Sequence, residues 1–467
     1  MRDITKFYFS DNYLNLADTM SLHQKLNSQA ERAILSIEEI IGLSWGIGMI
    51  DNQGPVFSIN CGAGLQLEKD KQLLYVCKDI NKPSDINDLY NLVSHDDNNL
   101  VCGVKPDEQS PICGSFYLYR QFTLNYKEVY DNVVELIKFI KKDLPVYDLS
   151  CHISSIKRKV LILTLSGKKL PIEETKTKAK INLVLHHEGD ILNKTVSLSI
   201  KNSNNNLAEL IWEKGVSLAV EARKSLNTYS VKSEPMDLIL APGGGGILIH
   251  EACGHLLEAD YILDNNSVFS KILGKKVASE SITICDRGDE EEDWVYEPFD
   301  CEGSPTSNVK LIANGYVSGV LTDVKTAKVL GCPNTGNARR QSYEFLPICR
   351  MRNTYLCAGN VLPEDIIKDT KKGIYAAAFT GGEVNSQTGD FVFWVNDGYL
   401  VEKGEITRPV RPFLYAGNAL DVLSKIDVVG NDLQFEVGEC GKEGQVVDVS
   451  YGQPTVRILS QNIGGLK

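Results

Sequence analysis

The first half of the chain has three stretches in which apolar residues recur at helical spacing. The first lies between residues 33 and 41, and we expect a helix there. A clearer stripe predicts a second helix that ends before Pro145; its members are Val129, Val133, Leu136, Ile137 and Ile140. The asparagines at 204–206 lead into the third helix, which runs through about Ala222.

Runs of β-branched and other apolar residues predict strands. Residues 45–50 and 55–59 flank a turn, and three later runs are expected to form a meander: 160–165, 181–185 and 196–200. After residue 233 the chain has glycine turns and short β-like runs, such as 390–395, in place of long helical patterns. We therefore expect an α+β fold with two domains. Helices on an antiparallel sheet would form residues 1–232, and a mostly β domain would form residues 233–467.

One short segment concentrates groups that bind metals. His250, Glu251 and His255 lie within six residues, directly after an apolar run, and the chain has only seven histidines in 467 residues. A pair of histidines with a carboxylate in this pattern makes a metal site the first hypothesis. The alternative is a pair of ordinary buried histidines.

The spacing of the two histidines is unusual for a helix. They are five residues apart, so in a regular α-helix their rings would diverge by roughly 140°. A π-bulge adds one residue to a turn and would bring both rings to one face. Gly254 tolerates such a distortion, so we expect a locally widened helix. The glycines at 243–246 lack the Lys-Ser/Thr of a phosphate loop and predict a tight turn from strand to helix.

The segment around these residues is similar to the signature of the TldD/PmbA metallopeptidases, on the TldD side that carries the metal motif. The similar segments are 241–260, 302–303, 335–340, 347–354, 381–382, 388–389, 417–418, 440–445 and 452–454. The resemblance covers residues 231–467, whereas residues 1–230 match only loosely.

The resemblance implies a zinc ion held by His250, His255 and Cys440. Three protein ligands and one open position suit catalytic zinc, which lowers the pKa of its bound water. Glu251 would then be the general base that takes the proton of that water and returns it to the leaving amine. Taken alone, Cys440 would more often be a small core residue. Cys253 is not a ligand in the family, so we expect it to pack in the core.

The resemblance also implies a function and partners. Members of the family form dimers that enclose the active site, either with themselves or with a homologous subunit that has lost the motif. They cut peptides that are unfolded or flexible, and an extended substrate would bind as an added β-strand. This chain keeps all four groups of the motif, so it is similar to the active subunit.

Four other charged residues near the motifs have two interpretations each. Glu258 and Asp260 would hydrogen-bond a ligand histidine, or would only cap or solvate the helix end. Arg339 and Arg340 would bind a carboxylate or carbonyl group of the peptide substrate, or would form surface ion pairs.

Composition narrows the class of protein. With 43% hydrophobic and 24% charged residues the chain is an ordinary globular protein. A net charge of −12 argues against a nucleic-acid partner. Twelve cysteines without short paired spacings are typical of reduced thiols. The first residues have no apolar signal core, and no apolar run reaches the length of a membrane span. We expect a cytoplasmic protein.

The sequence therefore favours a zinc-dependent peptidase. The alternatives are a zinc-stabilised peptide-binding or assembly subunit with little turnover, and hydrolysis of amides other than peptides. Retention of Glu251 favours an enzyme, because a structural zinc site needs no base beside its ligand. The substrate, internal or terminal cleavage, and the choice between homodimer and heterodimer are left open by the sequence.

Overall fold

The structure, a computed structural model of the chain, describes residues 31–69, 72–79, 125–201, 206–231 and 234–463. The chain divides into two compact units, and we describe each by itself. The first consists of residues 1–226 with 341–346, and the second consists of residues 227–340 with 347–467. The predicted boundary between residues 232 and 233 lies outside the described residues and stays a prediction.

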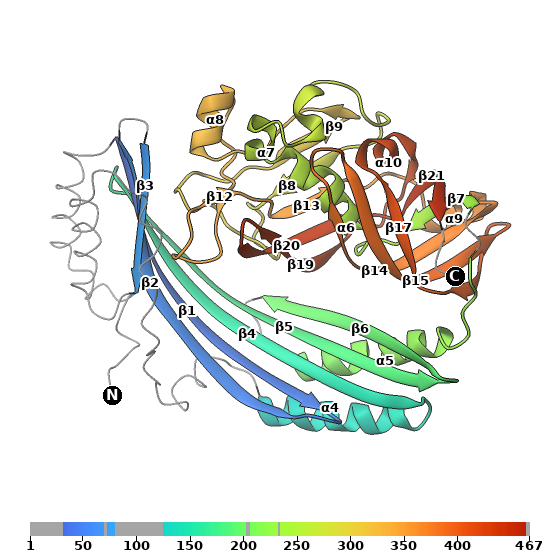
Figure 1. Cartoon of the computed structure of the whole chain (residues 1–467). Coiled ribbons are helices and arrows are strands. Elements are labelled where there is room, and N and C mark those ends of the chain that lie inside the picture. Colours follow the sequence, from blue (N-terminus) through green and yellow to red (C-terminus); the bar gives the residue numbers. More distant parts are fainter. Residues whose placement is uncertain (1–30, 70–71, 80–124, 202–205, 232–233, 464–467) are drawn as a thin grey trace. The chain divides into compact units, whose positions relative to one another are not determined.

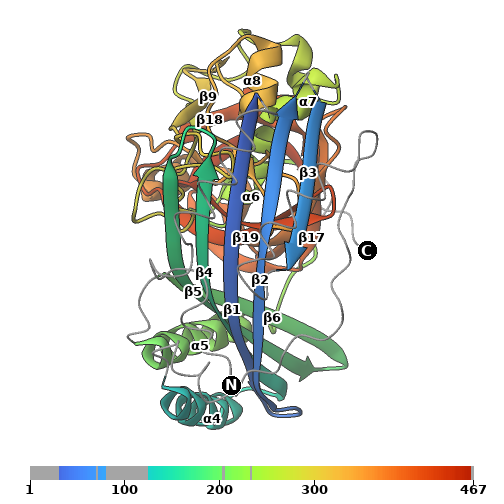
Figure 2. The ribbon, with the colours of Figure 1, turned by 90° about the vertical axis from the view of Figure 1, so that its left-hand side faces the viewer.

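The first unit is built on one antiparallel sheet of six strands in the order β3-β2-β1-β4-β5-β6. Its elements are β1 (Arg32–Gly48), β2 (Gln53–Lys69), β3 (Gln72–Asp79), α4 (Tyr126–Lys141), β4 (Val146–Thr164), β5 (Lys169–His187), β6 (Asp190–Lys201) and α5 (Leu207–Lys224). The two helices pack against each other and cover one face of the sheet (Figures 1 and 2). Helix α4 contacts β1 and β4, and α5 contacts β5 and β6. This arrangement confirms the predicted helices on an antiparallel sheet.

The apolar stripe of α4 explains why the helix lies where it does. Its buried residues are Val129, Val133, Leu136 and Ile140, which are four of the five predicted positions. Asn125 caps the helix by accepting a hydrogen bond from the backbone N–H of Glu128. A β-carbon on Gly215 of α5 would lie 2.3 Å from Leu136, so the glycine lets the two helices approach closely. The core beneath them is formed by the inward residues of β1, β4, β5 and β6.

The helix predicted for residues 33–41 is wrong, because these residues belong to strand β1. The strand pairs with β2 on one side and with β4 on the other. Residues 33–39 are all buried, so apolar residues do not alternate with exposed polar ones as they do in a half-buried strand. Without that alternation, the sequence pattern alone cannot separate a buried strand from a helix. A turn does join β1 to β2, but it comprises residues 49–52 and not the predicted 51–54, because β2 already begins at Gln53.

Residues 341–346 belong to the first unit although they lie far along the chain. Tyr343 is 2% exposed. Its hydroxyl lies 2.8 Å from Oδ1 of Asn60 and 2.5 Å from Oδ1 of Asp79 and can donate its one proton to either. Its backbone N–H donates to Glu38 at 2.7 Å. Tyr75 donates to the backbone carbonyl of Tyr343 at 2.5 Å. The sheet formed by β1, β2 and β3 therefore holds this segment through a buried tyrosine and several hydrogen bonds.

We expect Gly62→Ala to destabilise the first unit by about 1–3 kcal/mol, because the new methyl group overpacks a buried contact. A β-carbon at this position of β2 would lie 2.1 Å from the ring of Tyr343. Urea unfolding monitored by circular dichroism measures the loss. Gly54→Ala on the same strand is the matched control, because nothing lies within 4 Å of its β-carbon. Equal stability of the two variants would contradict the assigned packing of Tyr343.

The second unit contains two larger sheets. One has the strand order β10-β9-β8-β13-β20-β19; the other has the order β16-β15-β14-β7-β21-β18, with β17 paired to β15. Its strands are β7 (Glu234–Leu240), β8 (Ile284–Arg287), β9 (Val309–Ala313), β10 (Tyr316–Val317), β11 (Ala338–Arg339), β12 (Ile348–Cys349), β13 (Asn353–Leu356), β14 (Lys372–Val384), β15 (Asp390–Glu402), β16 (Glu405–Val410), β17 (Phe413–Asn418), β18 (Ile426–Val429), β19 (Gln434–Lys442), β20 (Gln445–Gln453) and β21 (Val456–Ile463). Strands β11 and β12 pair with each other. The mostly β character predicted for this part of the chain is confirmed.

The helical segments of this unit are short. They are α6 (Gly246–Ile249), η2 (His250–Gly254), η3 (His255–Leu257), α7 (Ala259–Leu263), η4 (Val268–Lys271), α8 (Val324–Leu330), α9 (Pro363–Asp369) and α10 (Ala419–Lys425). The continuous run α6-η2-η3 packs against β13 and β20 of one sheet and against β14 of the other. Its apolar residues join strands of both sheets in a single core cluster. The predicted metal motif therefore lies in the interior of this unit.

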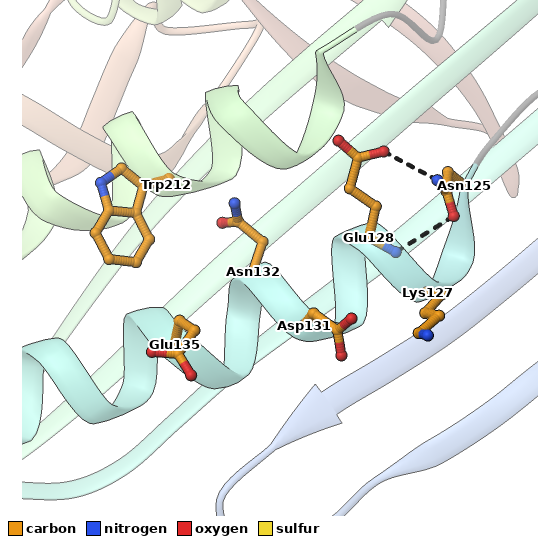
Figure 3. Close-up of a pocket in the computed structure, with 7 residues that line it drawn as sticks. All are labelled: Asn125, Lys127, Glu128, Asp131, Asn132, Glu135 and Trp212. Atoms are coloured by element: carbon orange, nitrogen blue, oxygen red, sulfur yellow. Dashed lines mark hydrogen bonds between the residues drawn. The ribbon is translucent and has the colours of Figure 1, made fainter.

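A surface groove of about 460 Å³ lies along α4 in the first unit (Figure 3). It is lined by Asn125, Lys127, Glu128, Asp131, Asn132, Glu135 and Trp212. None of the predicted site residues lines it, so the groove does not bear on the metal motif. In the part of the chain that the structure describes, no helix is both long enough and apolar enough to cross a membrane.

Candidate metal centre

The turn before the motif is formed as predicted. Strand β7 ends at Leu240, and the glycines that follow turn the chain into α6, with Gly243 at a φ of +80°. A β-carbon on Gly246 would lie 2.7–2.9 Å from the backbone of Gly452 in β20. Only glycine allows this close approach, so the start of α6 packs directly against the backbone of β20.

The helix widens at the two histidines. Residues His250–Gly254 form a π-helical turn, and the backbone N–H of His255 donates to the carbonyl of His250, five residues earlier. The two rings consequently come together edge to face, with centroids 5.0 Å apart and an angle of 81° between their planes. This is the distortion predicted from the five-residue spacing. Gly254 has ordinary helical dihedral angles, however, and it is required for space, because its β-carbon would lie 1.9 Å from Sδ of Met351.

Cys440 comes close to the two histidines from strand β19. Its Sγ lies 3.0 Å from Nε2 of His255. The possible ligand atoms of His250, His255 and Cys440 all lie within 4.8 Å of one another, and all three residues are buried. Among the described residues, this is the only group of three or more histidine, cysteine and acidic side chains close enough to share an ion. Cys253 is fully buried in the core, as predicted, and is not part of the group.

Glu251 points toward this group. Its Oε2 lies 4.0 Å from Nε2 of His255, and its side chain is 17% exposed. Burial raises the pKa of Glu251 above its usual value. The carboxylate is therefore near the histidine–cysteine group but still reached by solvent, as a general base for a water molecule must be.

A buried carboxylate orients His255. Glu258 has no exposed surface, and its Oε2 lies 3.0 Å from Nδ1 of His255. This contact keeps a proton on Nδ1, so loss of the other ring proton would free Nε2, which faces Cys440, to bind a metal. Glu258 also accepts a hydrogen bond from the backbone N–H of Met351 at 3.3 Å. Of the two interpretations made for Glu258 from the sequence, the structure places it against the histidine.

Lys442 forms ion pairs with both Glu258 and Asp260. Its Nζ lies 3.0 Å from Glu258 and 2.6 Å from Asp260, and its side chain is only 1% exposed. It also donates to the backbone carbonyl of Cys349 at 3.2 Å. Asp260 therefore contacts Lys442 and helps to hold the lysine in its contact with Glu258. The role of Lys442 was not predicted from the sequence. The available signal was its position two residues after Cys440, because alternate residues of a strand share a face.

These contacts set the charge of the group. Burial alone would raise the pKa of Cys440, but His250 and His255 outweigh burial and lower that pKa to about 4. Burial also raises the pKa of Glu258, but Lys442 and His255 hold that pKa at about 2. Burial lowers the pKa of His255, whereas Glu258 and Cys440 raise it well above its usual value. The cysteine is therefore a thiolate near neutral pH, the form that binds metals.

The chain is similar in sequence to proteins of one known family. Residues 233–465 match the family model described as the PmbA/TldA metallopeptidase C-terminal domain. A protein named Metalloprotease MJ0996, from Methanocaldococcus jannaschii, is 32% identical over 322 residues, which are 68% of this chain and 70% of that protein. The chain belongs to the TldD/PmbA family.

Other members of the TldD/PmbA family match mainly the second half of the chain. A Metalloprotease TldD homolog from Buchnera aphidicola is 40% identical over 243 residues, or 52% of this chain and 50% of that protein. A Zinc metalloprotease TldD homolog from Saccharolobus solfataricus is 38% identical over 50% of this chain and 52% of its own length. The chain thus spans about half the length of such relatives.

The fold as a whole is also shared. The crystal structure of TldE from Thermococcus kodakarensis superposes with a TM-score of 0.74 at 18% identity. That match covers 96% of this chain and 100% of the other. The likeness extends the shared fold to the first unit, where the sequence resemblance was weak.

Two arginines of the family segments have internal roles. Arg350 has no exposed surface and donates to the carbonyl of Cys440 at 2.5 Å, which holds the backbone of that cysteine in place. Arg339 is 4% exposed; it pairs with Glu297 at 2.9 Å and donates to the carbonyls of Met351 and Asp448. A surface ion pair is therefore the wrong description of Arg339. Its contacts give no support to substrate binding, which stays a prediction for Arg339 and for the buried Arg340.

The donor atoms fit a zinc ion. Two imidazoles and one thiolate are ligands that zinc prefers, and ligands about 2.0–2.3 Å from one ion lie roughly 3.3–3.8 Å apart. The observed distance of 3.0 Å between Sγ and Nε2 needs only a slight opening. The Nδ1 atom of His250 is buried and has no hydrogen-bond partner among the described residues. A buried nitrogen without a partner is rare and is explained where a bound ion or water completes the site.

Proposed function

We propose that this protein is a zinc-dependent peptidase in which His250, His255 and Cys440 hold the metal and Glu251 is the general base. The observation that carries the proposal is the convergence of three buried donor atoms from two distant segments, with a carboxylate 4.0 Å from one of them. A closed structural site would use a fourth protein ligand, whereas three ligands leave a position for water.

The residues of the chain have separate tasks in this proposal. Zinc bound there would polarise the scissile carbonyl and lower the pKa of its water. Glu251 would accept a proton from the attacking water and later deliver it to the leaving amine. Glu258 keeps the proton of His255 on Nδ1, and Lys442 keeps Glu258 ionised. Arg350 holds the carbonyl of Cys440, so the thiolate keeps its position.

We further propose that the substrates are unfolded or flexible peptides and that the protein works as a dimer. The likeness to TldE supports association with a homologous subunit, and self-association is the other form. The ten cysteines of the described residues are free thiols, which supports a reducing compartment such as the cytoplasm. Light scattering of the purified chain, alone and mixed with a homologous subunit, distinguishes the two kinds of dimer.

Removal of the metal is the direct test. We expect about one zinc ion per chain and hydrolysis of an unstructured peptide mixture. We also expect a chelator to abolish hydrolysis and added zinc to restore it. Cys440→Ala should lose most of the zinc. Cys332→Ala should keep it, because Cys332 is partly exposed and lies outside the group. Folded protein that binds no zinc, or hydrolysis that survives removal of zinc, would contradict the proposal.

A further inference from the structure

A second pair of reactive side chains lies in the same unit. Cys285 is in β8, and Cys357 directly follows β13, the strand that pairs with β8. Their sulfur atoms are 3.7 Å apart, although 72 positions separate the residues in sequence. Neither cysteine belongs to the metal-binding group, so the proposed peptidase activity does not use them.

The backbone directs the two sulfurs toward each other. In the antiparallel ladder Cys285 lies opposite Tyr355, and Cys357 is two residues beyond Tyr355. Residues two apart on a strand share a face, so the two cysteines are diagonal neighbours on one face. A disulfide requires the sulfurs to move from 3.7 Å to about 2.05 Å. The backbone N–H of Cys357, just beyond β13, donates to the carbonyl of Thr283 at 2.9 Å, so the remaining approach must come mainly from rotation of the two side chains.

The two thiols differ in exposure and in pKa. Cys285 is 3% exposed, whereas Cys357 is partly exposed. The hydrogen bond with Cys285, with help from the charges of Lys310 and Arg287, lowers the pKa of Cys357 to about 7. The pKa of Cys285 is raised, by the same hydrogen bond and by burial. Cys357 is therefore the nucleophilic thiolate of the pair near neutral pH, and Cys285 is the buried thiol behind it.

Cys440 also ionises readily, but it belongs to the metal-binding group, whereas Cys151 and Cys253 lack such an environment. Burial alone raises the pKa of Cys253 and raises that of Cys151 to about 12. A thiol in such surroundings stays protonated and does not react. Reactivity is therefore expected at Cys357 because of its neighbours.

We propose that Cys285 and Cys357 are a redox-modification site that closes to a reversible disulfide in the presence of a low-molecular-weight disulfide such as oxidised glutathione. The thiolate of Cys357 attacks one sulfur of the oxidant, forms a mixed disulfide and releases one thiol. Cys285 then gives up its proton and attacks the sulfur of Cys357, which releases the second thiol. The protein loses two hydrogens as it is oxidised, and the oxidant is reduced to two thiols.

The bond would change the sheet that carries part of the metal site. It would tie β8 to the end of β13, and β13 pairs with β20, which in turn pairs with the Cys440 strand β19. Closing a long loop disfavours the unfolded chain, so the oxidised second unit should resist unfolding. We expect its thermal midpoint to rise by about 5 °C or more.

The test uses the full chain loaded with zinc and treated with oxidised glutathione. We expect mass spectrometry of the digested protein to find a link between the peptides of Cys285 and Cys357. The thermal midpoint should rise, and dithiothreitol should reverse both changes. The rate of linking should increase with pH as the thiolate of Cys357 forms. Mapping the peptides distinguishes this bond from oxidation at Cys440.

Two variants complete the design. Cys357→Ser changes a partly exposed position and should abolish both the link and the rise of the midpoint. Cys332→Ser, also partly exposed, is the matched control and should behave as the wild type. The proposal is overturned if the folded wild type forms no link, or if a mixed disulfide persists at Cys357. A rise of the midpoint that is equal in Cys357→Ser would also overturn it.

Discussion

Glu251→Gln is expected to reduce peptide hydrolysis about a thousandfold while zinc stays bound. Glutamine has nearly the shape of glutamate but cannot accept the proton of the water, and a positioned general base contributes roughly 10²–10⁴-fold to the rate. The substitution should spare the metal, because the possible ligand atoms belong to His250, His255 and Cys440. Zinc content by mass spectrometry and hydrolysis of an unstructured peptide measure the two effects separately.

The control for this variant is Glu280→Gln, which changes an exposed glutamate paired with Lys276. It should keep both zinc and activity. Hydrolysis by Glu251→Gln at the wild-type rate would show that another group is the base. If both the wild type and the variant bind zinc and neither cleaves peptides, the site is structural or depends on a second subunit.

Lys442→Met is expected to have the largest effect on stability. The substitution keeps an apolar stem of similar length but leaves Glu258 and Asp260 without their cation. Because Glu258 has no exposed surface, water cannot replace the lost lysine, and only the contacts with His255 and the backbone N–H of Met351 remain. Removing one member of a buried ion pair typically costs about 3–5 kcal/mol in free energy of unfolding. Zinc affinity should fall roughly 10–100-fold, since Glu258 orients His255.

Lys276→Met is the matched control, because Lys276 also lies 3.0 Å from a carboxylate, Glu280, but both side chains are exposed. Solvent screens such a pair, so we expect little change of stability. Urea unfolding of both variants, with zinc and with chelator, gives the comparison. Equal losses in the two variants would show that burial of Lys442 has no energetic consequence.

The same cluster predicts an acid dependence with a definite sign. The pKa of Glu258 is about 2 in the folded protein, below its usual value of 4.5. Its ionised form therefore stabilises the wild type above about pH 4.5, and this contribution is lost as the pH falls toward 2. In Lys442→Met the pKa of Glu258 rises, so stability should fall less steeply over that range. Unfolding of both proteins between pH 5 and 3 measures the difference.

Local patterns in the sequence predicted the elements whose evidence lies within a few residues. The stripe of α4 and the glycine turn before α6 were both predicted correctly, because capping, turn formation and one buried helix face are local properties. The widened turn at His250 also followed from local geometry, since a five-residue spacing brings two rings together only when the helix gains a residue per turn.

The failures arise where burial or pairing depends on distant residues. Residues 33–41 form a strand because β2 and β4 lie on either side of it, and neither partner can be recognised from that segment. The inclusion of 341–346 in the first unit has the same origin, since the glycine that makes room for Tyr343 lies almost 300 positions earlier, in β2.

The candidate site shows this division most clearly. The sequence by itself was enough to predict the two histidines and the glutamate between them as candidate site residues. It also predicted the helix distortion that brings the two rings together. Cys440 was assigned through family resemblance, because no local pattern says which of twelve cysteines comes close to a helix 185 positions away. The pairing of Lys442 with Glu258 was decided by tertiary structure alone. A buried charge is stable only next to its partner, and packing of β19 against the helix determines that partner.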